Sequence, residues 1–169
     1  MISNKKRRNE GKIFEQDIKA SIPPEYFVER YKDDTAGFRG VANPADYRVY
    51  RYPYNFLLEL KSIKGKSLPL DKIKSSQLKG MRKANPYMGV CCGFLINYRD
   101  LEETYYVTFG DLASTFYILT SEGEYIPVPN GRKSVPVEWC RENGVRIQQI
   151  KKRTRYSYDL RRWLGGYYD

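Results

Sequence analysis

The feature that most constrains the fold is an unbroken apolar run, MGVCCGFLINY, at residues 88–98. Its length is that of a buried strand, and an apolar run without alternation is typical of a strand with both faces covered. The segment EETYYVTF at 102–109 is its expected antiparallel neighbour. A strand of this kind needs helices on both sides of its sheet.

Hydrophobic periodicity and turn residues place the other elements around this strand. Asn9 and Ser134 are candidate N-caps for two of the helices. The expected helices cover residues 10–21, 71–84 and 134–143, with short helical segments or turns at 110–119 and 157–166. The expected further strands cover residues 26–31, 47–52, 56–62 and 145–150. This order predicts an α/β or α+β fold with a mixed central sheet flanked by helices. We expect one domain over residues 1–169, with a basic leader at about 1–9 and a basic, tyrosine-rich segment at about 151–169.

The composition excludes several kinds of catalytic chemistry. The chain has no histidine, which rules out Ser-His-Asp and Cys-His catalysis and histidine-ligated zinc. Its three cysteines lack the CxxC spacing of a zinc site, and the adjacent pair Cys91 and Cys92 lies within the apolar run. We expect these two to be buried as small hydrophobic side chains. Hydrolytic chemistry would therefore use carboxylates, lysines and hard cations.

The charge of the chain indicates a polyanionic partner. Lysine and arginine number 30 against 20 acidic residues, which gives a net charge of +10. Such a balance favours nucleic acid or an acidic membrane surface. No apolar run approaches the ~20 residues of a membrane span, and the basic N-terminus lacks the apolar region of a signal peptide. We expect a cytoplasmic protein that is not inserted in a membrane.

The stretch FLLELKS at 56–62 combines a carboxylate and a lysine within an apolar strand. Alternation places Glu59 and Lys61 on one face of the strand, with Phe56, Leu58 and Leu60 on the other. One interpretation is a surface strand with a solvated face. The other is half of a metal-dependent active site.

Asp46 favours the second interpretation. It stands at the start of the strand 47–52, which a short turn separates from FLLELKS, so a hairpin would bring its carboxylate beside that of Glu59. Two adjacent carboxylates repel, and a divalent cation removes that penalty. Mg²⁺ suits one or two carboxylates completed by waters and phosphate oxygens. Taken alone, Asp46 could also be an ordinary turn or strand-start residue.

The pattern NPAD followed by ELK resembles the PD-(D/E)xK nuclease signature, with Pro44 and Asp46 offset by one residue from its tightest form. More of the chain, from about Asn9 to Trp163, resembles the RecU-like Holliday-junction resolvases of Gram-positive bacteria and their phages. Six short motifs carry this resemblance in the family's order: FE within NEGKIFEQDI, ADY, SLPL, SSQLKGM, GVCCGFLI and NGRKS. The resemblance implies the mixed α/β fold of restriction endonucleases. It also implies a Mg²⁺-dependent endonuclease, able to use Mn²⁺, that acts as a homodimer on four-way junctions. Such an enzyme makes paired symmetric nicks that leave 5′-phosphates.

The same resemblance implies roles for individual residues. Asp46 and Glu59 resemble the principal metal ligands, assisted by the backbone carbonyl of Leu60. Lys61 resembles the lysine that activates or positions the attacking water. Glu15 resembles a first-helix acid that reaches the metal directly or through water, and Gln77 a helix glutamine near the site. For Glu15 and Gln77, an ordinary place on a helix surface is the alternative.

Clusters of basic residues are the candidate DNA contacts. One cluster follows the proposed site, and a second, interleaved with tyrosines, lies near the C-terminus. The predicted DNA-binding residues are Lys5, Lys6, Arg7, Arg8, Arg39, Lys64, Lys66, Lys72, Lys74, Arg132, Lys133, Lys151, Lys152, Arg153 and Arg155. Solvated charge without a partner is the alternative, and it applies best to the N-terminal leader.

The chain departs from the resolvase pattern in two places. The insertion that forms a junction-entering stalk in the family is compressed here to KDDTAGFRGVAN, which leaves its mode of junction engagement open. Pro44 stands where relatives often have threonine. Two other functions therefore remain as alternatives: a nuclease of the same type acting on another DNA substrate, and a non-catalytic basic DNA-binding module.

Overall fold

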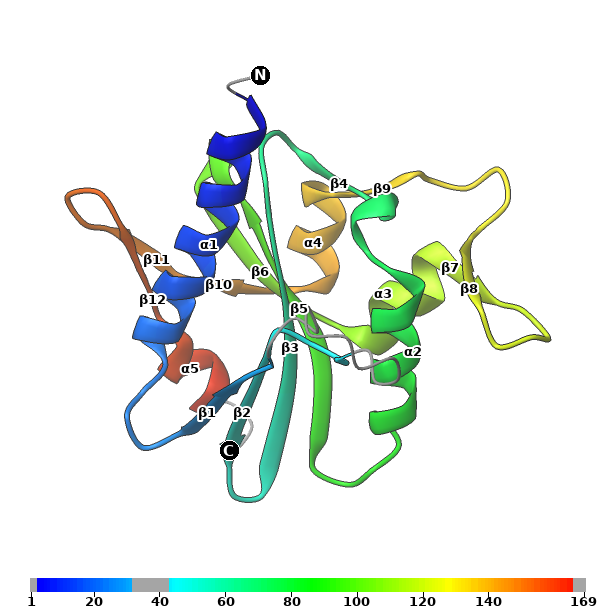
Figure 1. Ribbon diagram of the computed structural model, residues 1–169, viewed down its shortest axis with the longest axis horizontal. Helices are drawn as coiled ribbons and strands as arrows, with labels where there is room; N and C mark the ends of the chain where they lie inside the picture. Colours follow the sequence, from blue (N-terminus) through cyan, green and yellow to red (C-terminus); the bar gives the residue numbers. More distant parts are fainter. Residues whose placement is uncertain (1–2, 32–42, 166–169) are drawn as a thin grey trace.

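A six-stranded mixed sheet forms the centre of the molecule (Figure 1). The computed structural model describes residues 3–31 and 43–165. The strand order is β1-β2-β3-β5-β6-β10, in which the β3–β5 pair is parallel and the other pairs are antiparallel. The strand bounds are β1 Phe27–Arg30, β2 Tyr47–Arg51, β3 Tyr54–Ile63, β5 Val90–Tyr98, β6 Glu103–Thr108 and β10 Val145–Ile147.

Helices cover both faces of this sheet. On one face, α1 and α5 pack against it through Phe14, Ile18 and Trp163; on the other, α2, α3 and α4 pack through Leu78 and Leu112, among others. The helix bounds are α1 Ser3–Ser21, α2 Ser75–Ala84, α3 Phe109–Phe116, α4 Val137–Asn143 and α5 Leu160–Gly165. The predicted mixed α/β architecture with flanking helices is confirmed. None of the helices in the described ranges is long and apolar enough to cross a membrane.

Three two-stranded sheets and two 3-10 helices lie around this core. Their strands are β4 Ser67–Pro69 with β9 Ser134–Pro136, β7 Tyr117–Leu119 with β8 Tyr125–Pro127, and β11 Gln149–Lys151 with β12 Tyr156–Tyr158. The 3-10 helices are Leu70–Lys72 and Arg99–Leu101.

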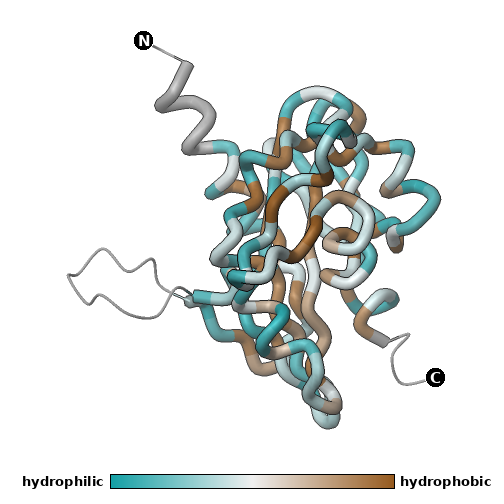
Figure 2. Tube along the Cα trace, turned by 90° about the vertical axis from the view of Figure 1, so that its right-hand side faces the viewer, coloured by the Kyte–Doolittle hydropathy of each residue, from teal (hydrophilic) through white to brown (hydrophobic). Residues whose placement is uncertain are grey.

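The apolar run at 88–98 forms the strand β5 from Val90 to Tyr98, and its predicted antiparallel pairing with β6 is confirmed. Residues 92–98 are all buried, and Figure 2 shows hydrophobic segments running through the middle of the molecule. Gly93 is required by close packing, because a Cβ there would collide with the Tyr106 ring and with the Val107 carbonyl oxygen, at 2.6 Å. Cys92 and Cys140 are buried, whereas Cys91, which was also expected to be buried, is only half-buried, and no cysteine of the chain is in a disulfide.

Several predicted element bounds were wrong. The first helix starts at Ser3, so it continues through Asn9, which is not its N-cap. The helix expected over 71–84 starts at Ser75, because residues 70–72 form a 3-10 turn and Ile73 is extended. Ser134 lies in β9, where pairing with β4 keeps it extended, and Pro136 is the N-cap of α4. The segment 145–150 divides into β10 and β11, which pair with different partners.

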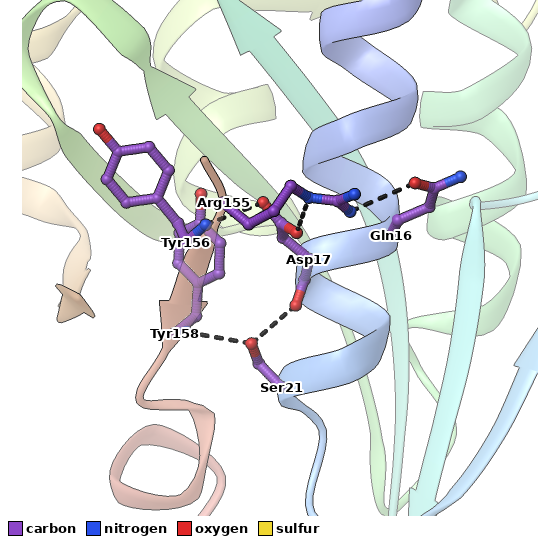
Figure 3. A network of polar contacts seen from close by, with 6 residues as sticks. All are labelled: Gln16, Asp17, Ser21, Arg155, Tyr156 and Tyr158. Carbon is purple, nitrogen blue, oxygen red and sulfur yellow. Dashed lines mark hydrogen bonds and ion pairs between the residues drawn. The ribbon is translucent and has the colours of Figure 1, made fainter. Parts of the chain in front are cut away.

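A buried carboxylate joins α1 to the β11–β12 hairpin (Figure 3). Asp17 is 5% exposed, and its side chain accepts hydrogen bonds from Arg155 Nε at 2.6 Å and from the Tyr156 backbone N–H at 3.1 Å. One turn along the helix, Ser21 Oγ donates to the Asp17 carbonyl and accepts from the Tyr158 N–H. These bonds satisfy backbone donors of β12 and fix the hairpin against α1.

We expect Asp17→Ala to lower the free energy of unfolding by about 1–3 kcal/mol, because it leaves part-buried donors of Arg155 and Tyr156 without their acceptor. Urea denaturation measures this loss. The control is Glu25→Ala, which removes the acid of the exposed Arg161–Glu25 pair. Exposed ion pairs contribute little, so the control should stay near the parent protein. Equal stabilities for the two variants would contradict the structural role of Asp17.

Candidate active site

The β2–β3 hairpin places Asp46 opposite Glu59, as predicted. Tyr47 pairs with Leu58 in the antiparallel register, and the Asp46 N–H donates to the Leu58 carbonyl at 3.0 Å. One step further, the Asp46 side chain replaces a main-chain acceptor: its Oδ2 accepts from the Leu60 N–H at 2.7 Å. This bond fixes the Asp46 carboxylate at the point where β2 begins, beyond which β3 is paired only with β5.

The same register sets the direction of the Leu60 carbonyl. In a strand the N–H and C=O of one residue point to the same edge, and residues two apart share that edge. Because Leu58 and Leu60 both bond to Asp46 on the β2 side, the Leu60 carbonyl points to the edge that carries the Asp46 carboxylate. It is therefore oriented toward the position that the metal-ligand prediction requires.

Packing of α2 supports this arrangement from the side. Gly80 lies against Pro44, and a Cβ at that glycine would come within 2.9 Å of the Pro44 Cα. Ala45 is buried beside it. The glycine of the SSQLKGM motif thus allows the chain entering Asp46 to lie directly on the helix.

Glu59 is not on a solvated face. Its side chain is buried, 3% exposed as a residue, because α2 covers this side of β3. The surface-strand interpretation of FLLELKS is therefore wrong. A buried carboxylate requires compensation, and the Lys61 ammonium supplies it at 2.9 Å from Glu59 Oε1.

Gln77 links Glu59 to the start of α2. Its amide nitrogen donates to Glu59 Oε1, and its amide oxygen accepts from the Lys74 N–H at 2.9 Å in a capping box. Both ends of the amide are therefore engaged, which fixes the side chain toward the carboxylate. An ordinary place on the helix surface is excluded for this residue.

Burial raises the pKa of the Glu59 carboxyl from 4.5 to about 7. Lys61 opposes this shift, the neighbouring Asp46 carboxylate adds to it, and the Gln77 hydrogen bond lowers the pKa slightly. Two carboxylates that repel in this way gain from a cation placed between them. The described residues contain no cluster of three or more His, Cys, Asp or Glu side chains suited to a metal.

The donor set fits a hard divalent cation. Two carboxylates and one carbonyl offer oxygen only, which is the preference of Mg²⁺, and Mg²⁺ keeps several waters rather than needing a full protein cage. The residues that would hold it are Asp46, Glu59 and Leu60 through its carbonyl. Mn²⁺ accepts similar oxygen ligands.

Glu15 lies on the inner flank of α1, where it forms an ion pair with Arg30 at 3.2 Å. Burial is the main cause of a raised pKa for the Tyr47 hydroxyl, and the charges of Glu15 and Asp46 both add to it. The Glu15 carboxylate is thus on the β2 side of the site. Its direct or water-mediated contact with a metal stays a prediction.

The basic residues predicted to bind DNA divide between two surfaces. Pairing of β4 with β9, together with a Leu70 N–H to Lys133 carbonyl bond of 3.0 Å, joins one group around the end of β3: Lys64, Lys66, Lys72, Lys74, Arg132 and Lys133. The second group lies on the β11–β12 hairpin: Lys151, Lys152, Arg153 and Arg155. Arg155 also has a structural role, because it forms an ion pair with the buried Asp17. Arg39 and the side chains of Lys5, Lys6, Arg7 and Arg8 fall outside the described residues.

A family comparison gives this geometry its context. The sequence model of the family Recombination protein U (RecU) matches residues 31–159. The chain belongs to the RecU family. The predicted resemblance to RecU-like proteins is thereby confirmed.

Two individual relatives show the extent of the similarity. The chain is 32% identical over 167 residues to the SPbeta prophage-derived uncharacterized protein YotM of Bacillus subtilis (strain 168), covering 93% of this chain and 86% of that protein. It also aligns with the 1.6 Å structure of Archaeoglobus fulgidus Hjc, a Holliday junction resolvase from an archaeal hyperthermophile. That alignment covers 83% of this chain and 94% of Hjc, with a TM-score of 0.49 and 11% identity, levels that do not bear on function.

The raised pKa of Glu59 predicts pH-dependent Mg²⁺ binding in this RecU-family chain. Below pH 7 the carboxyl is mostly protonated, and a cation must displace that proton, so affinity should fall about tenfold per pH unit well below the pKa. Calorimetric Mg²⁺ titrations between pH 5.5 and 8 measure this dependence. The matched variant is Asp46→Asn, which should bind Mg²⁺ weakly and lower the pKa of Glu59 by removing a neighbouring negative charge. Affinity that is constant over this pH range would contradict the assignment of Glu59 as a ligand.

Proposed function

We propose that this protein is a Mg²⁺-dependent endonuclease that resolves four-way DNA junctions. The observation that carries the proposal is the buried Glu59 beside Asp46 and Lys61 in a chain of the RecU family. Buried carboxylates whose pKa values are strongly perturbed by burial and by a neighbouring charge are concentrated at functional sites. The name of the family links it to recombination, and the net charge of +10 suits a nucleic-acid partner.

The proposed reaction is hydrolysis of a phosphodiester bond. Water attacks phosphorus in line with the P–O3′ bond, which breaks and leaves a 5′-phosphate and a 3′-hydroxyl. A divalent cation, when bound, would lower the pKa of the attacking water and offset charge on the phosphate. Asp46, Glu59 and the Leu60 carbonyl would hold that cation, and Glu15 is proposed to support it directly or through water.

Lys61 and Gln77 complete the catalytic assignment. The Lys61 ammonium lies 2.9 Å from Glu59 and side by side with it on one face of β3. We assign it to orient the attacking water and to stabilise charge on the phosphate in the transition state. Gln77 positions Glu59 through its hydrogen bond, so it acts on the ligand rather than on the substrate.

The substrate sets the proposed assembly. Resolution of a four-way junction needs two cuts related by two-fold symmetry, and one site per chain in a two-fold homodimer provides them. The residues described form one nuclease domain in this proposal, acting in the cytoplasm of a bacterium or of a phage-infected host. The prophage origin of the relative from Bacillus subtilis supports the phage setting.

Junction cleavage with mapped nick positions tests the function. With Mg²⁺ or Mn²⁺ we expect paired nicks at symmetric positions, and we expect Asp46→Ala and Glu59→Ala to reduce the rate at least about 100-fold, since each removes a proposed metal ligand. The control variant is Asp111→Ala, an exposed acid on α3. Persistent Mg²⁺-dependent cleavage by both ligand variants would show that the ligands are misassigned.

Substrate comparison separates this function from its alternatives. If the protein cuts linear duplex and flap DNA as readily as the junction, it is another nuclease of the same type and not a resolvase. Complete inactivity of the unaltered protein with either metal, accompanied by DNA binding, would instead indicate a binding module.

A further inference from the structure

A basic cavity of about 490 Å³ opens at the end of β3, next to Lys61. Its cationic lining residues are Lys61, Lys64, Lys72 and Arg99, and no acidic residue lines it within the described part of the chain. Gly11 of α1 also lines it. Leu60 and Lys61 therefore belong to both the proposed catalytic centre and the lining of this cavity, so the two adjoin each other.

Arg99 is held in the wall by a chain of polar contacts from the central sheet. Its Nη1 donates to Ser62 Oγ at 3.2 Å, and Ser62 Oγ donates to Asn97 Oδ1 at 3.0 Å. Asn97 is buried and donates in turn to the buried Thr104 at 2.9 Å. The guanidinium thus has a fixed place beside the residue that follows Lys61.

The loop that carries Lys64 is fixed to the same wall. The Gly65 N–H donates to Asp100 Oδ2 at 3.1 Å, and Asp100 follows Arg99 in the 3-10 helix. Gly65 has φ +91°, a conformation that favours glycine. This bond therefore ties the loop of Lys64 to the 3-10 helix that carries Arg99.

The charges of the cavity are only partly balanced. Lys61 is paired with Glu59, and Arg99 with Glu10 at 3.0 Å. Among the described residues, Lys64 and Lys72 have no ion-pair partner. A phosphate group is the anion that suits an arginine fork flanked by lysines.

We propose that this cavity binds a backbone phosphate of the cleaved DNA strand, next to the phosphate held at Lys61, with Arg99 as its main ligand. The inference rests on the proposed function, since it takes the catalytic centre as the place of cleavage. The volume lies within the ~300–1,000 Å³ range of ligand pockets, so it has room for a nucleotide unit of a strand. Arg99 is a new candidate for DNA binding, because the sequence analysis predicted only neighbouring lysines as DNA contacts.

Binding to DNA without cleavage tests the cavity. Fluorescence anisotropy in EDTA gives the affinity for a labelled junction and for labelled duplex across a salt series. For Arg99→Gln we expect about tenfold weaker binding, the effect of one charge-assisted contact. We also expect the slope of log K against log salt to fall in magnitude by about 0.9, one phosphate contact. Arg99→Lys should restore most of the slope, because it keeps the charge.

The matched control is Arg161→Gln on α5. Arg161 also forms an exposed ion pair with a glutamate, so this variant makes the same change of charge outside the cavity. It should leave the affinity and the salt slope close to those of the parent protein. Equal losses for Arg99→Gln and Arg161→Gln would overturn the proposal, because they would reflect net charge alone.

Glu10→Gln gives a change in the opposite direction. It removes the acid that competes with phosphate for Arg99, so we expect about threefold tighter DNA binding. Thermal melting of each variant checks that it is folded. Unchanged binding and an unchanged salt slope in a folded Arg99→Gln variant would overturn the cavity assignment.

These outcomes are separate from those of the proposed function. If the unaltered protein cleaves junctions while Arg99→Gln binds normally, only the cavity assignment fails. If the unaltered protein cleaves no DNA yet Arg99→Gln loses a phosphate contact, the catalytic proposal fails and the cavity remains a DNA-binding site.

Discussion

The parallel pairing of β3 with β5 is the constraint on which the rest of the structure depends. The register runs from Asn55 opposite Val90 to Ile63 opposite Tyr98, and β2 pairs with the other edge of β3 from Tyr54 to Leu58, so the first half of β3 is a central strand. A central strand in a sheet covered by helices on both faces has no solvated side. Glu59 directly follows the doubly paired segment on the face that α2 covers, so its burial follows from the topology.

Burial of Glu59 is costly, and the surrounding contacts reduce that cost without removing it. Lys61 supplies the opposite charge and Gln77 a hydrogen bond, yet the pKa of the carboxyl is still raised to about 7. Replacement of a whole buried ion pair by apolar residues of similar volume is often neutral or stabilising in other proteins. The cost of burying Glu59 therefore favours a proposed role in cation binding over a role in the stability of the fold.

Local patterns sufficed to predict the elements that carry this site. The apolar run predicted the buried strand β5, and the turn between two strand-like segments predicted the hairpin that aligns Asp46 with Glu59. The alternation in FLLELKS was correct, but it could not show whether the face of Glu59 is solvated, because the answer depends on the helix α2 later in the chain. Tertiary pairing also explains the error at Ser134, a good N-cap residue that is extended because β9 pairs with β4.

Sequence patterns could not predict contacts between residues that are far apart in the chain. Arg99 meets Ser62 and Glu10 from elements far apart in the chain, and no local motif marks it. Arg155 shows the converse: it lies in a basic run, yet its guanidinium is engaged by the buried Asp17. A run of basic residues in the sequence shows only where charge is concentrated. Which of these residues has a structural role depends on the contact with the buried Asp17.

The two basic surfaces lie on either side of α1 (Figure 1). One adjoins the proposed catalytic centre at Lys61, and the other is the hairpin that Asp17 fixes to the helix. A four-way junction presents several duplex arms around one branch point, so a protein that engages it gains from phosphate contacts in more than one direction. Because Asp17 and Glu10 both lie on α1, this helix sets the hairpin at one position along its length and borders the cavity at another. The relative placement of the two surfaces is therefore as rigid as the packing of α1 on the sheet.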